Sequence, residues 1–171
     1  TWETRFLGKT HAQSLEKFRN LNPNLSFYLF DKEKRDAYMK SSWQGEMISE
    51  IYFNSIFGPM KSDIFRYCLL YDLGGYYFDI AKACSIPLNE LHKKDDTGVI
   101  TYEDNELFYP PEDKSLFKLK RPFNYFLQWG LAFSPNHQFL KQLITDIESN
   151  YHLYKDKKFI NPKLAILNFT G

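Results

Sequence analysis

Apolar residues recur along the chain at helical spacing in several blocks, each bounded by turn-forming residues. This spacing predicts helices over residues 10–20, 45–57 and 137–150. Thr10 is the expected N-cap of the first helix, and Asp31 is the expected N-cap of a polar helix over residues 32–40. A last helix is expected over residues 162–167, after Pro162.

Short runs of aromatic and β-branched residues stand between these helices. They predict strands at residues 25–30, 76–80 and 99–102, with a further strand within 126–133. Residues 103–121 contain Pro110-Pro111 and are expected to form a long loop. Helices that alternate with short strands are typical of the α/β class.

Gly58-Pro59 is expected to break the chain before the most apolar helical block, residues 63–73. This block is apolar on nearly every side, which is typical of a buried helix. Yet it contains Asp63 and Arg66, which lie three positions apart and therefore share a helix face. A buried charge must be paired or put to use. Two interpretations remain open: the two side chains neutralise each other within the helix, or both project toward a polar ligand.

Gly74 and Gly75 follow this helix and predict a tight turn into the next strand, with Gly74 in the left-handed conformation. That strand is aromatic, and its carboxyl end carries Asp79. Ligands of α/β proteins bind beyond the carboxyl ends of strands, so Asp79 is a candidate site residue. A simple role in the turn is the alternative.

Composition narrows the class of protein. The chain has 171 residues, of which 43% are hydrophobic and 18% aromatic, so residues 1–171 are expected to form one globular domain. A net charge of +1 argues against a nucleic-acid binder, which usually has a basic excess. Two cysteines do not make a disulfide framework, and no apolar run approaches the roughly 18 residues that span a membrane. A cytoplasmic location is expected, and the basic stretch at 114–121 leaves a peripheral membrane contact open.

The central block carries a specific resemblance. Its residues are Ser62-Asp63-Ile64-Phe65-Arg66-Tyr67, Leu70-Tyr71, Gly74-Gly75-Tyr76-Tyr77 and Asp79. This pattern resembles the DXD-containing sugar-binding region of glycosyltransferase family 32, which includes fungal α-1,6-mannosyltransferases and bacterial capsule and oligosaccharide transferases. The core of the clostridial glucosylating toxins is similar. Looser similarity lies at Thr1-Trp2, at residues 133–137 and at Thr170-Gly171, which resembles the start of a Thr-Gly-Pro motif.

The resemblance implies a GT-A-like α/β/α sandwich that binds a nucleotide-diphospho-sugar, with its first strand and its C-terminal part outside this chain. It implies transfer of a hexose from that donor to a glycan or lipid-linked acceptor, as in polysaccharide biosynthesis, with retention of configuration. A divalent cation, Mn²⁺ or Mg²⁺, is the implied cofactor. The location would then be cytoplasmic, with or without membrane association.

The same resemblance implies roles for individual residues. Asp63 and Arg66 are expected at the donor sugar, and Asp79 at the ribose and the metal, which makes these three the expected catalytic residues. The expected donor-binding set adds five more residues: Trp2, Tyr67, Gly75, Tyr77 and Lys82. For Trp2, stacking on the base and packing in the core are equally good interpretations.

The chain departs from the family pattern at one position. Position 81, where the second aspartate of DXD is expected, is Ala. Three interpretations follow: the metal is held by Asp79, the diphosphate and a residue outside the chain; Lys82 replaces the metal as a fixed positive charge; or catalysis is lost. The last leaves a non-catalytic protein that binds a sugar nucleotide or a glycan.

Overall fold

The computed structural model describes residues 7–80, 82, 84–102, 118, 126–156, 158, 165–166 and 169–171. Five α-helices lie in this part of the chain: α1 (Lys9–Leu21), α2 (Lys32–Ser42), α3 (Met47–Asn54), α4 (Gly58–Leu73) and α5 (Gln138–Asn150). Short 3-10 helices occur at Leu88–Glu90 and Tyr151–Leu153. The predicted loop at 103–121 lies outside the described residues except for Lys118. The predicted last helix does so except for Ala165 and Ile166, which are helical.

Helix ends test the capping predictions. The Asp31 side chain accepts a hydrogen bond of 2.9 Å from the Lys34 amide, which confirms it as the N-cap of α2. The prediction for Thr10 is wrong, because α1 begins at Lys9 and its N-cap is Gly8. The helix predicted at 45–57 is shorter at both ends, since Gly45 has a φ of +84° and Ser55 is extended.

Three short strands form an antiparallel sheet in the order β1-β3-β2: β1 (Gly75–Phe78), β2 (Gly98–Val99) and β3 (Gly130–Phe133). In their register Tyr77 lies opposite Leu131, and Val99 lies opposite Ala132. The predicted strand at 25–30 is wrong, because this segment pairs with no described strand.

The core lies between the sheet and helices α2 to α5. Its buried members come mostly from α3 and α4, and β1, β3 and α5 complete it. Among them are Ile48, Ile51, Tyr52, Ile64, Phe65, Cys68, Tyr77, Leu131, Leu140 and Ile144. The C-terminal turn of α5 is tied to this layer, because the Glu148 carboxylate accepts a 2.9 Å hydrogen bond from the Ile48 amide at the start of α3.

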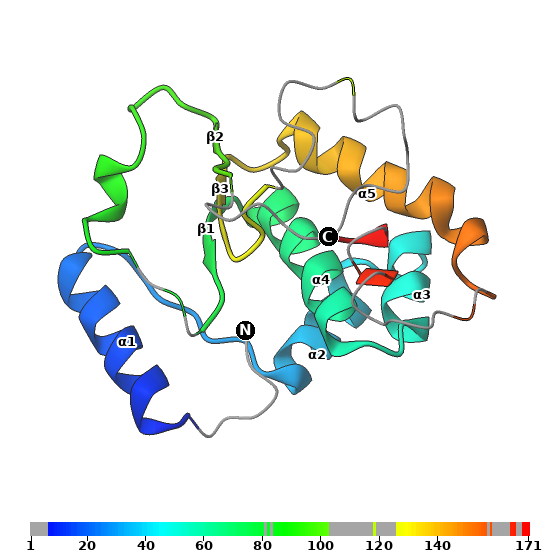
Figure 1. The fold of residues 1–171 in the computed structure, drawn as a ribbon, viewed down its shortest axis with the longest axis horizontal. Coiled ribbons are helices and arrows are strands. Elements are labelled where there is room, and N and C mark those ends of the chain that lie inside the picture. The colour runs from blue at the N-terminus through cyan, green and yellow to red at the C-terminus, as the bar shows by residue number, and fades with distance from the viewer. Residues whose placement is uncertain are drawn as a thin grey trace.

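Helix α1 lies on the other side of the sheet from α4 and α5 (Figure 1). Its one buried apolar side chain, Phe18, meets the ring of Phe78 on β1 edge to face at 4.8 Å and that of Phe27 at 5.7 Å. The described part of the chain is therefore an α/β arrangement with a large core on one face of the sheet and a much thinner contact on the other.

Candidate functional site

The turn between α4 and β1 places the end of β1 over the middle of α4. Gly74 has a φ of +64°, and a Cβ atom there would lie 2.6 Å from Cδ of Pro135. Only glycine fits a position that combines a left-handed backbone with so close a neighbour. The predicted left-handed turn at Gly74 is thus confirmed, and it brings Asp79 back beside Arg66.

Asp63 and Arg66 form a buried ion pair in α4, with Nη2 of Arg66 3.0 Å from Oδ1 of Asp63. The two residues are 5% and 4% exposed. The second carboxylate oxygen of Asp63 accepts a 2.8 Å hydrogen bond from the hydroxyl of Thr170, near the C-terminus. Both oxygens of Asp63 therefore already have partners within the protein.

The guanidinium of Arg66 joins three parts of the structure. Its Nε donates to the carbonyl of Ser62 at 3.3 Å, and its Nη1 donates to the carbonyl of Gln128. Nη2 also lies 3.6 Å from Oδ1 of Asp79, and the group stacks over the ring of Tyr77 at 4.8 Å. Arg66 thus binds the start of β3 and the end of β1 to α4.

Burial controls the protonation of this group of side chains. Loss of solvent raises the pKa of Asp63 to about 6, although Arg66 and Thr170 favour the charged form. Burial alone would lower the pKa of Arg66, but Tyr77, Asp63 and Asp79 together raise it above its ordinary value. Arg66 is therefore always a cation here, whereas Asp63 titrates at a mildly acidic pH.

Tyr67 fixes two distant segments to the same helix. Burial raises the pKa of its phenol well above the ordinary range, so the group stays protonated and can donate. The hydroxyl donates to the carbonyl of Thr170 at 2.7 Å and lies 2.6 Å from Oε1 of Gln128. Its predicted contact with the donor stays a prediction.

Asp79 is the accessible carboxylate of the group, with a side chain that is 39% exposed. Oδ1 accepts a 2.8 Å hydrogen bond from the Tyr77 hydroxyl and faces Arg66, while Oδ2 has no partner among the described residues. The Asp79 amide donates to the carbonyl of Trp129 at 3.0 Å, which continues the pairing of β1 with β3. One oxygen is held in place and the other is free to bind.

Lys82 lies one turn beyond Asp79, because its amide donates to the Asp79 carbonyl at 2.9 Å. Its ammonium group stands 4.9 Å from the centre of the Trp129 ring, a cation–π contact that orients a side chain otherwise exposed to solvent. A carboxylate and an ammonium are thus presented within one turn of each other after the carboxyl end of β1. Ala81, which lies between them, is outside the described residues.

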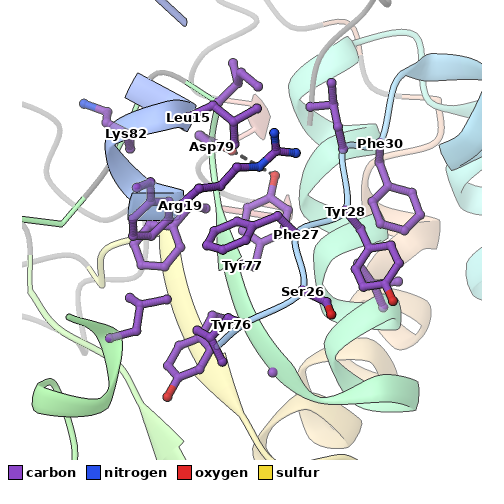
Figure 2. Close-up of a pocket in the computed structure, with 18 of the residues that line it drawn as sticks. Leu15, Arg19, Ser26, Phe27, Tyr28, Phe30, Tyr76, Tyr77, Asp79 and Lys82 are labelled. Carbon is purple, nitrogen blue, oxygen red and sulfur yellow. Dashed lines mark hydrogen bonds between the residues drawn. The ribbon is translucent and has the colours of Figure 1, made fainter. Parts of the chain in front are cut away.

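These two side chains stand at one end of a cavity of about 710 Å³. Figure 2 shows Asp79 and Lys82 at this end, with the rings of Tyr76 and Tyr77 along one wall. Four predicted donor-binding residues line the cavity, namely Gly75, Tyr77, Asp79 and Lys82, whereas Asp63, Arg66 and Tyr67 lie behind its wall. Trp2 lies outside the described residues.

The predicted metal at Asp79 can be compared with the ligands present. The described residues contain no cluster of three His, Cys, Asp or Glu side chains that could hold a metal ion. Asp79 offers one free oxygen, and a guanidinium lies close to the other, whereas hard divalent cations take about six oxygen ligands. The described residues do not fit a divalent cation by themselves, and the metal stays a prediction that needs further ligands.

Sequence reasoning missed three residues of this site. The sequence places Gln128 and Trp129 only within a predicted strand, and it indicates for Thr170 only a similarity to the start of a motif. Each reaches the site through a contact with a residue at least 47 positions away, and the main-chain oxygens of all three accept hydrogen bonds there. A main-chain acceptor has no signature in the sequence, so no local pattern could have found them.

Comparison with known proteins identifies the class. Residues 8–98 match the family described as "Glycosyltransferase sugar-binding region containing DXD motif", and the chain belongs to this family. The match covers α1 to α4, β1 and the Asp79–Lys82 turn. The resemblance inferred from the central block is therefore confirmed.

Particular relatives come from Schizosaccharomyces pombe. The chain is 27% identical over 165 residues to its initiation-specific alpha-1,6-mannosyltransferase and 24% identical over 159 residues to its inositol phosphoceramide mannosyltransferase 1. Each alignment covers 91% of this chain but only 40% and 43% of the relatives, so the chain spans less than half their length.

A solved structure supports the fold. The PaToxG Glycosyltransferase superposes with a TM-score of 0.67 at 16% identity, covering 100% of this chain and 63% of the other. The GT-A-like α/β fold that the resemblance implied is thereby confirmed. Within the described residues, no helix is both long and apolar enough to cross a membrane.

Proposed function

We propose that the protein is a glycosyltransferase that moves a hexose from a nucleotide-diphospho-sugar to a glycan or lipid-linked acceptor, with retention. The observation that carries this proposal is that Asp79 and Lys82 both line the same end of the cavity. The relatives named as mannosyltransferases support a hexose as the transferred group.

The chemistry of transfer assigns a role to each of the two. Breaking the bond between the anomeric carbon and the diphosphate leaves negative charge on the diphosphate and positive charge on the sugar. The Lys82 ammonium would stabilise the negative charge as it develops, the part that a metal plays in many such sites. The free oxygen of Asp79 would accept hydrogen bonds from the ribose hydroxyls.

The buried pair is proposed to act at the rear of this site. Asp63 and Arg66 are predicted at the donor sugar, yet Asp63 can reach a sugar hydroxyl only if Thr170 releases its Oδ2. In the described arrangement Arg66 contacts the Asp79 carboxylate directly and stacks over Tyr77, whose hydroxyl donates to the same carboxylate. The buried pair therefore holds Asp79 in position. We therefore propose that this group positions Asp79, and that a direct sugar contact requires displacement of Thr170.

Binding measurements on the full-length protein test the proposal. UDP, GDP and their hexose conjugates are titrated with Mn²⁺ and with a chelator, and donor hydrolysis is followed separately. We expect a diphosphate nucleotide to bind in chelator, with affinity about 10- to 100-fold lower for Lys82→Ala. Lys82→Arg should keep part of the affinity, and Lys141→Ala, a change on the exposed face of α5, should match the wild type.

Three other results would change or refute the proposal. If chelation abolishes binding, a metal is required and Lys82 does not replace it. If no donor binds, the transferase proposal fails. Binding without hydrolysis or transfer would favour the second candidate, a non-catalytic protein that binds a sugar nucleotide, which the fully partnered state of Asp63 also supports.

A further inference from the structure

A second hollow, of about 190 Å³, lies on the face of the sheet that points away from the core. Leu131 and Phe133 of β3 are buried in the core, and strand side chains alternate between faces, so Ala132 points outward. In the register Ala132 lies between Tyr76 of β1 and Val99 of β2, and all three line the hollow. Its floor is therefore made of two small apolar side chains, with a tyrosine beside them.

One wall of the hollow is aromatic. The rings of Tyr76 and His92 both line it, with their centres 5.7 Å apart. The Tyr76 hydroxyl contacts Nε2 of His92, and Nδ1 of His92 lies 2.8 Å from the carbonyl of Lys93. A carbonyl only accepts, so Nδ1 carries a proton, and in the neutral ring Nε2 accepts from the hydroxyl. The two rings are thus tied together, and a lone pair of the Tyr76 oxygen stays available.

The rest of the rim is polar and has unused hydrogen-bonding capacity. Oδ2 of Asp96 accepts a 2.7 Å hydrogen bond from the Lys93 amide, while Oδ1 has no partner among the described residues. Nδ1 of His137 accepts from the Phe139 amide at 3.2 Å, so its Nε2 is the donor in the 3.3 Å contact with the Thr97 hydroxyl. That hydroxyl therefore keeps its own proton for another acceptor.

This combination matches the chemistry of a neutral sugar ring. A pyranose presents hydroxyls around its edge, which a carboxylate oxygen and a hydroxyl can bind, and C–H groups on its face, which pack on aromatic rings. Pockets for drug-sized ligands have volumes of about 300–1,000 Å³. At 190 Å³, against 710 Å³ for the larger cavity, this hollow is suited to one ring and not to a nucleotide.

We propose that this hollow is a second binding site, for one neutral pyranose residue of a glycan. The sugar ring packs against Tyr76 and His92, and its hydroxyls bind Asp96 and Thr97. The site is distinct from the one at Asp79, because Tyr76 and Asp79 lie toward opposite ends of β1 (Figure 2). Three residues of strand between them correspond to about 10 Å. The proposal does not require that the protein transfers a sugar.

Two other classes of ligand match the hollow less closely. An anion would face the Asp96 carboxylate, and none of the described residues that line the hollow is a lysine or an arginine. An organic cation would be attracted by the carboxylate and the rings, but it would leave the proton of the Thr97 hydroxyl without an acceptor. The experiment therefore includes a cation as a competing probe.

A titration of the full-length protein, with ¹³C-labelled alanine and valine methyl groups, tests the inference. The probes are methyl α-mannoside, methyl β-glucoside and methyl β-galactoside, and the readout is the methyl signals of Ala132 and Val99. We expect at least one probe to shift both signals and to saturate them with a Kd of about 1–10 mM. UDP and GDP should not displace the bound sugar.

Variants of the rim separate binding from folding. Asp96→Ala should weaken sugar binding about tenfold or more, because it removes a charged acceptor. Asp95→Ala, an exposed carboxylate next to it that does not line the hollow, is the matched control. Thr97→Val should weaken binding about 3- to 10-fold, whereas Thr97→Ser keeps the hydroxyl and should keep the affinity. Ala132→Leu fills the floor and should abolish binding.

Four results would overturn the inference. No shift of the two methyl signals at about 100 mM of every probe would show that the hollow binds no sugar. Displacement by UDP or GDP would assign the sugar to the larger cavity. A response to tetramethylammonium alone would assign the hollow to a cation. Equal affinities of the wild type and Asp96→Ala would remove the carboxylate from the site. Because the sugar titration itself contains no nucleotide, its failure leaves the proposed donor site unaffected.

Discussion

Two charged side chains in an apolar helix are the residues on which the site depends. The sequence left open whether Asp63 and Arg66 pair with each other or face a ligand, and the structure shows the pair, completed by Thr170 and by Asp79. The helix pattern could predict that both would be buried on one face. It could not predict Thr170, which comes from 107 residues further along the chain.

Stability should depend on the protonation of Asp63. Its pKa in the folded protein is about 6, against an ordinary value of 3.8, because burial disfavours the carboxylate. A folded pKa above the unfolded one means that stability is greatest below the unfolded value and is lost as pH rises from about 4 to 6. We expect a loss of roughly 2–3 kcal/mol from this group across that window.

The ¹³C shift of the Asp63 carboxyl, followed by NMR against pH, measures this value directly. Thr170→Val removes the hydroxyl that favours the charged form, so its midpoint should lie above that of the wild type. A wild-type midpoint below 4 would contradict the prediction, since it would mean that Arg66 outweighs burial.

Gly74 should be the least replaceable residue of the turn. Gly74→Ala adds a Cβ 2.6 Å from Pro135 at a φ of +64°, whereas Gly45→Ala has a similar φ of +84° and nothing within 4 Å. Both variants carry the strain of a positive φ, so their difference reports the clash with Pro135 together with any added strain from the ψ of −162° at Gly74. We expect Gly74→Ala to lose at least about 2 kcal/mol more in urea unfolding than Gly45→Ala. Equal losses would show that Pro135 moves aside freely.

At the scale of elements, local patterns predicted helices better than strands. Helices α2 and α5 lie close to their predicted bounds, because periodicity and caps are properties of the helix itself. Helix α4 ends as predicted but begins at Gly58, so the break expected at Gly58-Pro59 is wrong; Pro59 lies in the first turn, where proline is tolerated. Strands need neighbours, and residues 25–30 have the composition of a strand without a described partner. Residues 25–30 therefore stay outside the sheet because no described strand lies beside them, and not because of their composition.

Helix α3 depends on α5 for its N-terminal cap. Its own N-cap, Glu46, makes no side-chain bond, and the Ile48 amide donates instead to Oε1 of Glu148 at 2.9 Å. Glu148→Ala should therefore cost about 1–2 kcal/mol in urea unfolding, because it removes an acceptor and a negative charge from a helix N-terminus. Glu148→Gln keeps an acceptor and should lose less. Glu50→Ala, an exposed change on α3, is the control, and a cost for Glu148→Ala no larger than this would refute the cap.

At the scale of the molecule, the site is assembled from three separate regions around α4. The 58–82 block was found from sequence because its charges and glycines violate an otherwise apolar pattern. Residues Gln128, Trp129 and Thr170 contribute a main-chain oxygen and a side-chain contact each, and only the fold brings them to α4 and the end of β1. The fold class and the central block were thus predictable from the sequence, while the other residues of the site were not.

The two cysteines provide a readout of global unfolding, because one is fully buried and the other is partly exposed. Cys68 is 0% exposed in the centre of α4, and burial raises the pKa of its thiol well above the ordinary range. Cys84 is only partly buried. Since a thiolate is the reactive form, a disulfide reagent should label Cys84 rapidly and Cys68 only when the core opens.

Ile64→Ala makes this prediction quantitative. Ile64 belongs to the same buried cluster, and its truncation should cost about 2–5 kcal/mol. When opening is fast relative to labelling, the Cys68 rate follows the open population, so it should rise by about 30- to 5,000-fold. The Cys68 rate is measured with and without Ile64→Ala in a Cys84→Ser background, so that Cys68 is the only thiol. The rate for Cys84 is measured separately in Cys68→Ser. If Ile64→Ala leaves the Cys68 rate unchanged, the thiol is reached by local fluctuation and α4 is not the centre of one cooperative core.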